Sequence, residues 1–295
     1  MRRTLNVGSL PWLKTQDGST EVVCEYFVAV HGAPRLQSEN IRGCLGWLSG
    51  GGGSLALRLR PAGASESQRG YRSGGNIKKG ELGLGAVPGR EAEFRQGLDQ
   101  ALKYARALNC TRIHLMAGRV PGDSHRTVVA KEMESIFVQN LNYAADILSK
   151  EGITGLIEPI NTRITDPRYF LDSPHQAAAI LEKVGKPNIK LQMDVFHWQI
   201  MDGNLTQNIH KYFPIIGHVQ IAQVPGRNEP DSAGELNYSY LFSMLENLDY
   251  QGYIGCEYKP LCSTKEGLGW IKDYCTHSRF QWPITPMQFK SKYVL

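Results

Sequence analysis

Four oxygen-bearing side chains stand near the C-terminal ends of four successive apolar segments. Glu158 lies in LIEPIN, Asp194 in LQMDVFH, Gln220 in HVQIA and Glu257 in GCEYKP. Three carboxylates in one place repel one another unless a cation neutralises them, because burying unpaired charge is costly. Carboxylate and amide oxygens are the ligands that Mg²⁺ and Mn²⁺ prefer. A paired core acid could explain any one position, but the set of four predicts a shared site for a hard divalent ion.

Further polar residues are candidates for contact with a substrate. His197 follows Asp194 by three residues, at the mouth of the same segment, and is expected to contact substrate. His114 in RIHLMAG and Arg227 in a later loop are two more substrate-binding candidates. His218 lies two residues before the predicted amide ligand of its strand, so it is expected one layer deeper, as a packed core residue.

These residues need strands that alternate with helices to bring them together. Helical spacing of apolar residues covers 90–109, 130–152, 173–185, 204–212, 239–252 and 263–275, and strand patterns cover 112–118, 155–161, 189–197, 216–223 and 253–260. Such alternation predicts parallel strands with right-handed crossovers, in a doubly wound sheet or a (β/α)₈ barrel. The GLG of GELGLGAVPG is no nucleotide fingerprint, because no strand precedes it and Pro88 interrupts the helix that should follow. Polar residues at strand ends favour the TIM barrel, and no nucleotide cofactor is expected.

The first 78 residues differ in texture from the rest. They hold thirteen glycines, including SGGGGS, with ten Lys/Arg against five Asp/Glu, whereas residues 79–295 carry 23 of each. Only EVVCEYFVAV (21–30) predicts a strand there. We therefore expect a largely irregular or disordered Gly/Ser/Arg-rich segment at 1–78, an incomplete barrel domain with five clear β/α units at 79–276, and a tail at 277–295.

Composition indicates the cellular compartment and the kinds of partner. No run of 18 apolar residues exists, so no membrane span is expected. Six cysteines without a CxxC pair predict reduced thiols and an intracellular, cytoplasmic protein. The basic start at Met1–Arg3 leaves organelle targeting as an alternative. No basic–aromatic pattern indicates nucleic acid, and the sequence leaves a homo-oligomer open.

Seven stretches resemble the hydroxypyruvate isomerase family of xylose-isomerase-like barrels: GLGAVPGREAEF, YARALNCTRIHLMAGRVP, LIEPINTRITDPRYFL, LQMDVFHWQIMDGNLT, GHVQIAQVPGRNEP, GELNYSYLF and GCEYKP. The resemblance covers about residues 79–276 and does not extend into the first 78. It implies interconversion of hydroxypyruvate and tartronate semialdehyde (2-hydroxy-3-oxopropanoate). It also implies acid/base roles for Glu158 and Glu257, and metal-ligand roles for Glu158, Asp194, Gln220 and Glu257.

The residue chemistry is compatible with that reaction. Moving a carbonyl to the neighbouring carbon requires a proton to leave one carbon and reach the next, and two facing carboxylates can do this through an enediolate. The expected substrate is a small hydroxy-carbonyl acid. Alternatives are a sugar epimerase of the same barrel superfamily, a phosphodiesterase acting on abasic DNA, and a catalytically impaired, truncated isoform. The DNA enzyme would need more histidine ligands and a basic face.

Overall fold

The computed structural model describes residues 81–108, 110–262 and 266–271, together with three strand segments at 25–29, 71–72 and 75–76. Helices within these ranges are too short or too polar to cross a membrane. The tail expected at 277–295 lies outside the described residues. Most of residues 1–78, for which irregular structure is expected, lie outside them as well.

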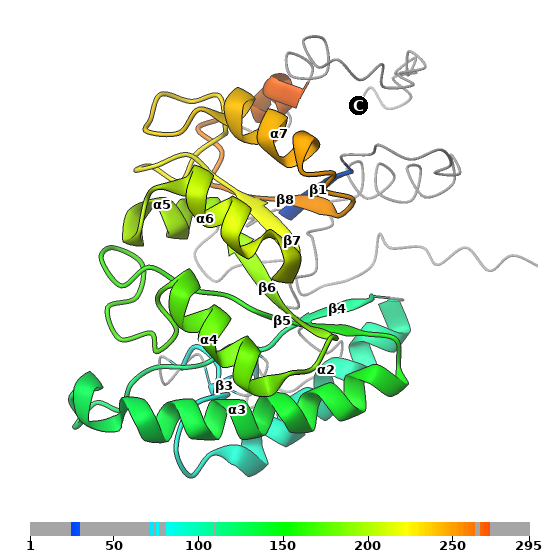
Figure 1. The fold of residues 1–295 in the computed structure, drawn as a ribbon, viewed down its shortest axis with the longest axis vertical. Coiled ribbons are helices and arrows are strands. Elements are labelled where there is room, and N and C mark those ends of the chain that lie inside the picture. The colour runs from blue at the N-terminus through cyan, green and yellow to red at the C-terminus, as the bar shows by residue number, and fades with distance from the viewer. Residues whose placement is uncertain are drawn as a thin grey trace, which may run out of the picture.

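A five-stranded parallel sheet is the centre of the fold (Figure 1). Its strands are β4 (Arg112–His114), β5 (Thr154–Ile157), β6 (Ile189–Asp194), β7 (Ile216–Ile221) and β8 (Tyr253–Glu257), and each pairs with the next along the chain. β1 (Glu25–Ala29) adds an antiparallel strand beside β8. β2 (Tyr71–Arg72) and β3 (Gly75–Asn76) form a separate pair. The five parallel strands make up a half-barrel, as the alternation of segments predicts.

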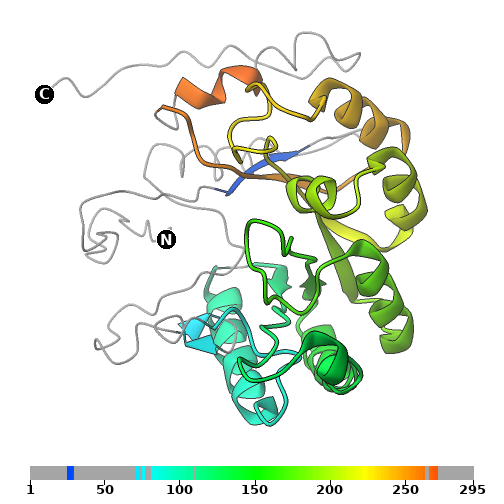
Figure 2. The same cartoon turned by 90° about the vertical axis from the view of Figure 1, so that its left-hand side faces the viewer.

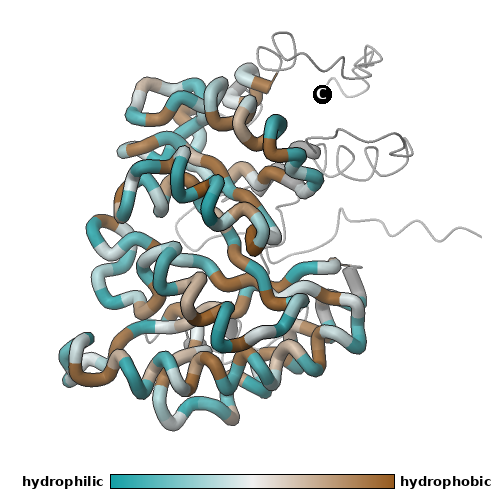
Figure 3. The backbone as a smooth tube through the Cα atoms, in the orientation of Figure 1, coloured by the Kyte–Doolittle hydropathy of each residue, from teal (hydrophilic) through white to brown (hydrophobic). Residues whose placement is uncertain are grey.

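Helices connect the strands and cover one side of the sheet (Figure 2). They are α2 (Glu91–Leu108), α3 (Arg126–Lys150), α4 (Pro174–Val184), α5 (Val195–Met201), α6 (Leu205–Tyr212) and α7 (Tyr238–Asn247), with 3₁₀ turns at Phe213–Ile215 and Glu266–Leu268. Helix α3 packs on β5 and α4 packs on β6. Hydrophobic positions recur along the strands and alternate with hydrophilic ones along α3 (Figure 3).

Helix α3 shows why the apolar spacing produces this packing. Met133, Phe137, Leu141, Ala144 and Leu148 recur every three or four residues, and all are buried. That spacing places them on one face of a helix, which packs against the sheet and removes the face from water. Burial of such faces on both helices and strands fixes the positions of the strand ends that carry the polar residues.

All five parallel strands end two to four residues before the C-terminal bounds expected for them, and two of them show why. The strand expected at 189–197 ends at Asp194, because the Asp194 side chain accepts a hydrogen bond from Phe196 N at 2.9 Å and starts helix α5. The strand expected at 112–118 leaves the ladder after His114. Its continuation instead meets the segment around Gly85, whose amide N donates to Met116 O at 3.0 Å. The strand expected at 21–30 is found over Glu25–Ala29.

Candidate functional site

The four predicted oxygen donors meet at one end of the parallel sheet. Asp194 and Gln220 are register partners on β6 and β7. Glu158 follows β5 directly, and Glu257 ends β8. Parallel strands of a barrel present their C-terminal ends at the same face, so these side chains converge there. Glu158, Asp194 and Gln220 are buried, whereas Glu257 is partly exposed.

Two amides link the two glutamates. Gln192 Nε2 donates to Glu158 Oε2 at 2.8 Å and to Gln220 Oε1 at 2.6 Å. Gln220 Nε2 in turn donates to Glu257 Oε2 at 2.7 Å. Because an ionised carboxylate can only accept, the glutamates at the two ends fix the direction of both amides between them. The site is therefore an ordered hydrogen-bonded row rather than a set of loosely placed acids.

Arg227 closes the site from the loop after β7. Its Nη2 lies 3.0 Å from Asp194 Oδ2 and 3.2 Å from Glu257 Oε2, and its Nε donates to the Glu257 carbonyl oxygen at 3.1 Å. The guanidinium carbon also lies 4.8 Å from the centre of the Phe196 ring. The backbone of Arg227 has φ = 55°, a region that residues other than glycine seldom adopt. The loop thus holds a strained residue against two of the acids, where the sequence predicts a substrate contact.

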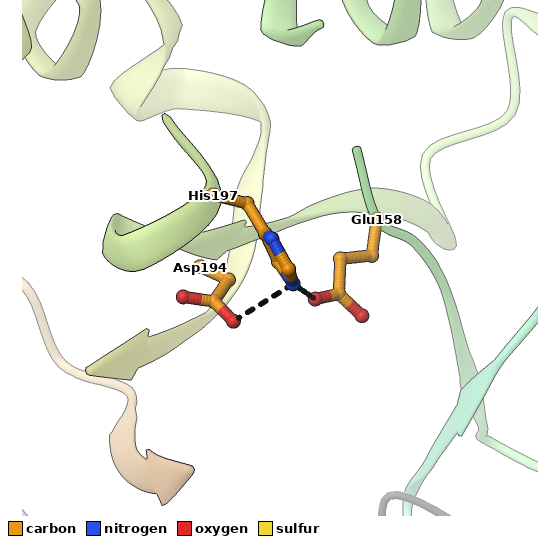
Figure 4. A group of neighbouring side chains, drawn as sticks. All are labelled: Glu158, Asp194 and His197. Atoms are coloured by element: carbon orange, nitrogen blue, oxygen red, sulfur yellow. Dashed lines mark ion pairs between the residues drawn. The ribbon is translucent and has the colours of Figure 1, made fainter. Parts of the chain in front are cut away.

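Both predicted histidines point at Glu158. His197 Nε2 lies between two carboxylates, 3.7 Å from Glu158 Oε1 and 3.5 Å from Asp194 Oδ2 (Figure 4). His114 Nδ1 lies 3.4 Å from Glu158 Oε2 on the other side. Burial lowers the pKa of His114 to about 4, and burial together with Arg227 and His114 lowers the pKa of His197 well below its usual range. Both rings are therefore neutral at physiological pH.

The charges of the site favour a divalent cation. Glu158, Asp194 and Glu257 contribute three negative charges against the guanidinium of Arg227, which leaves about −2 when the histidines are neutral. Burial raises the pKa of Asp194 to about 7; Arg227 opposes the rise and Glu257 adds to it. Ligand atoms of Glu158, Asp194 and His197 lie within 4.8 Å of one another. A divalent cation would balance the charge and keep Asp194 ionised, so the donor set fits one.

Sequence reasoning missed two polar residues of the site. Gln192 lies two positions before Asp194 on the same strand, and strand alternation could have placed both on one face. Asn161, three residues after Glu158, contacts His197 through both its backbone N and its side-chain amide. It lies in an irregular loop, where no periodicity indicates the direction of a side chain.

Known proteins with similar sequences include a barrel family and named isomerases. The profile of the family described as Xylose isomerase-like TIM barrel matches residues 68–274. A zebrafish (Danio rerio) protein with hydroxypyruvate isomerase in its name is 68% identical over 200 residues, which cover 68% of this chain and 72% of that relative. A 2-oxo-tetronate isomerase of Cupriavidus necator is 46% identical over 200 residues, covering 68% and 75% of the two chains.

A solved structure supports the same fold. The crystal structure named AP endonuclease, family 2, from Brucella melitensis is 46% identical, has a TM-score of 0.64, and is matched over 68% of this chain and 75% of that one. The half-barrel, the acids at its strand ends and the similarity to these relatives all indicate the same family. The chain belongs to the xylose isomerase-like TIM barrel family and, within it, is an isomerase of the hydroxypyruvate isomerase group.

Proposed function

We propose that this chain is a metal-assisted isomerase that interconverts hydroxypyruvate and tartronate semialdehyde. One glutamate, Glu158 or Glu257, removes a proton from the hydroxymethyl carbon, and the other returns a proton to the former ketone carbon. The hydroxyl on the first carbon loses its proton as that oxygen becomes a carbonyl, and the second oxygen gains one. Atoms balance without an oxidant or a reductant, so no nucleotide cofactor is required.

The observation that carries this proposal is the hydrogen-bonded row from Glu158 through Gln192 and Gln220 to Glu257. It holds two carboxylates at fixed positions on the two sides of one site, which a two-glutamate proton transfer requires. Arg227 and His197 would bind the oxygens of the small acid between them. His114 would hold Glu158 in place, since its Nδ1 lies 3.4 Å from Glu158 Oε2.

A divalent ion, Mg²⁺ or Mn²⁺, would be held by oxygens of Glu158, Asp194, Gln220 and Glu257. When bound, it would supply positive charge to the two neighbouring oxygens of the substrate as negative charge develops on them. The residues of the site also control its charge and its access to water. Arg227 offsets part of the acid charge and covers Asp194, while burial of Glu158 and Asp194 keeps water from their carboxylates.

A 2-oxo-tetronate isomerase is the second candidate, because a relative of that name matches the same 200 residues at 46% identity. The reaction would use the same proton transfer on a substrate with one more carbon. A phosphodiesterase of abasic DNA has weaker support. Its several zinc ions would call for more histidine ligands, and within the described residues the group of potential metal ligands contains only His197 with two acids.

The test is turnover by the purified chain of residues 1–295, followed by NMR, with each of the two substrates and with added Mg²⁺, added Mn²⁺ or a chelator. Conversion of hydroxypyruvate that depends on a divalent ion supports the proposal. A clear preference for 2-oxo-tetronate would replace it with the second candidate. Cleavage of an abasic-site oligonucleotide without any isomerisation would reject both. Glu246→Gln, on α7 away from the strand ends, is a matched control and should leave turnover unchanged.

A further inference from the structure

The loop after β7 carries Arg227, although the residues next to it give it little support. Residues 222–237 contain no helix or strand. Pro225 and Gly226, which come directly before Arg227, are exposed. Arg227 itself has the left-handed backbone conformation, which is unfavourable for a residue with a side chain. Contacts from elsewhere in the loop must therefore hold this backbone, and with it the guanidinium that meets two acids of the site.

The backbone of Gln223 closes the base of this loop. Gln223 N donates to Asn228 O at 3.0 Å, and Gln223 O accepts from Arg227 N at 2.8 Å. Both distances are those of ordinary hydrogen bonds. The turn thus leaves from one residue and returns to it, and that residue holds the backbone on both sides of the peptide between Arg227 and Asn228.

The side chain of Gln223 holds the second half of the loop. Its Oε1 accepts from Val224 N at 3.1 Å and from Leu236 N at 2.8 Å. Its Nε2 donates to Pro230 O and to Leu236 O, both at 3.1 Å. All four partners are backbone groups that can only donate or only accept, so the orientation of the amide is unambiguous at both ends. The amide pairs with the N–H and the carbonyl of Leu236 as a neighbouring strand would.

This side chain is buried within the loop that it organises. Only 2% of Gln223 is exposed, so water does not replace its partners. Gly234 passes so close that a Cβ there would lie 2.4 Å from Gln223 Cγ and 2.3 Å from Val224 O. Both amide hydrogens and both lone pairs of the amide oxygen are used. A substitution that removes them leaves buried backbone groups of the loop without partners, which is costly.

The loop that Gln223 organises is joined in turn to the loop after β8. Lys259 N donates to Arg227 O at 2.6 Å, and Asn228 Nδ2 donates to Lys259 O at 2.9 Å. Arg227 Nε also donates to Glu257 O at 3.1 Å. A shift of the Arg227 backbone would therefore break contacts with the end of β8 and the loop after it, and would move the guanidinium away from the acids.

We propose that Gln223 is a positioning residue, which holds Arg227 where its guanidinium meets Asp194 and Glu257 and can bind an oxygen of the substrate. The six hydrogen bonds described for Gln223 all go to backbone groups of residues 224–236. Its effect on the reaction therefore passes through the loop and through Arg227. The contact with substrate rests on the proposed function, whereas the position of Arg227 does not.

A double-mutant cycle with Arg227 tests this role. Gln223→Glu keeps the size of the side chain and places an oxygen against the carbonyls of Pro230 and Leu236. Gln223→Met keeps the length without hydrogen bonds, and replaces Gln223→Glu if a buried charge prevents folding. Each variant is combined with Arg227→Ala in the full chain, and KM and kcat for hydroxypyruvate are measured at a fixed concentration of Mg²⁺ or Mn²⁺. Gln139→Glu, an exposed amide on α3, is the matched control and should leave both constants unchanged.

The cycle separates a positioning role from an independent one. Arg227→Ala should raise KM roughly 10- to 100-fold, the range for a lost hydrogen bond to a charged group. Each Gln223 variant should raise KM at least about fivefold and change kcat less. The double variant should match Arg227→Ala within about twofold, because Gln223 then has no guanidinium to position. An unchanged KM in both Gln223 variants would overturn the proposal, and so would a double variant that shows the product of the two single effects.

Hydrogen–deuterium exchange measured by mass spectrometry follows the loop without any turnover. In the Gln223 variants, peptides covering 224–236 and 257–262 should exchange faster, the second because Lys259 N bonds to Arg227 O. Peptides of α3 should exchange as in the unsubstituted chain. Unchanged exchange over 257–262 would overturn the proposal. Faster exchange over both segments, in a chain that does not convert hydroxypyruvate, would support the positioning of Arg227 by Gln223 and reject the proposed function.

Discussion

Addition of Mg²⁺ or Mn²⁺ to the purified chain should raise its melting temperature, and Asp194→Asn should remove most of that effect. The three acids of the site and Arg227 leave a charge of about −2, so the proposed divalent ion should bind the folded site far better than the unfolded chain. At a free ion concentration of 100 times Kd, the folded state gains about 2.7 kcal/mol. For a domain of this size, that corresponds to a rise of roughly 5 to 10 °C.

Asp194→Asn is informative because it separates charge from structure. Asparagine is as good an N-cap as aspartate, so the contact with Phe196 N that starts α5 is retained. The variant loses one charge of the site, and its ion-dependent shift should fall below about 2 °C. Without added metal it should be at least as stable as the unsubstituted chain, since a buried charge has been removed.

Differential scanning calorimetry of the full chain, with a chelator and then with each ion, measures both effects. The exposed Asp123→Asn is the matched control and should keep the full shift. Equal ion-dependent shifts in Asp194→Asn and the unsubstituted chain would refute the assignment of the ion to these residues. An unsubstituted chain that shows no shift with millimolar Mg²⁺ or Mn²⁺ would refute the ion itself.

Three further predictions concern protons and backbone. Because burial raises the pKa of Asp194 to about 7, protons compete with the ion below that pH, and its affinity measured by calorimetry should fall about tenfold from pH 8 to pH 6; a constant affinity would contradict this. Burial lowers the pKa of His114 to about 4, so between pH 6.5 and pH 4 the unfolded chain binds a proton at this ring that the folded chain does not, and the free energy of unfolding falls as the pH falls. His114→Gln should therefore reduce the loss of unfolding free energy between pH 7 and pH 5 by about 2 kcal/mol. The exposed His210→Gln is the control and should leave that loss unchanged. Gly83→Ala should cost more stability in urea than Gly89→Ala, although both glycines have positive φ, because a Cβ at Gly83 would lie 2.3 Å from Met116 Cβ and one at Gly89 meets nothing; equal losses, the roughly 1 kcal/mol of backbone strain alone, would count against this.

The sequence was sufficient to predict the half-barrel because the periodicity of its segments is strong. In α3 and β6 the burial of apolar residues follows the pattern of the sequence, and parallel pairing then brings the strand ends to one face. The placement of Asp194 and Gln220 as neighbours follows from the same argument. What these side chains do chemically, and the proposed domain limits, remain predictions.

Other features could not be read from a pattern. Asp194 both ends a strand and caps a helix, and a run of apolar residues gives no sign of that switch, so the strand was predicted three residues too long. The contact of Asn161 with His197 joins a loop to a helix 36 residues away and depends on the fold of the turn at Ile164 and Thr165. Such contacts follow from tertiary structure and from the direction of individual hydrogen bonds, which carry no periodicity.

Solvent deuterium incorporation tests the central claim, proton transfer by two glutamates, most directly. With hydroxypyruvate in D₂O and the full chain, NMR should detect deuterium on the former ketone carbon of tartronate semialdehyde. Glu158→Gln and Glu257→Gln should each slow this incorporation at least ~100-fold, the scale of general acid–base catalysis. Product that forms without solvent deuterium, or incorporation that continues at the same rate in both variants, would contradict the account.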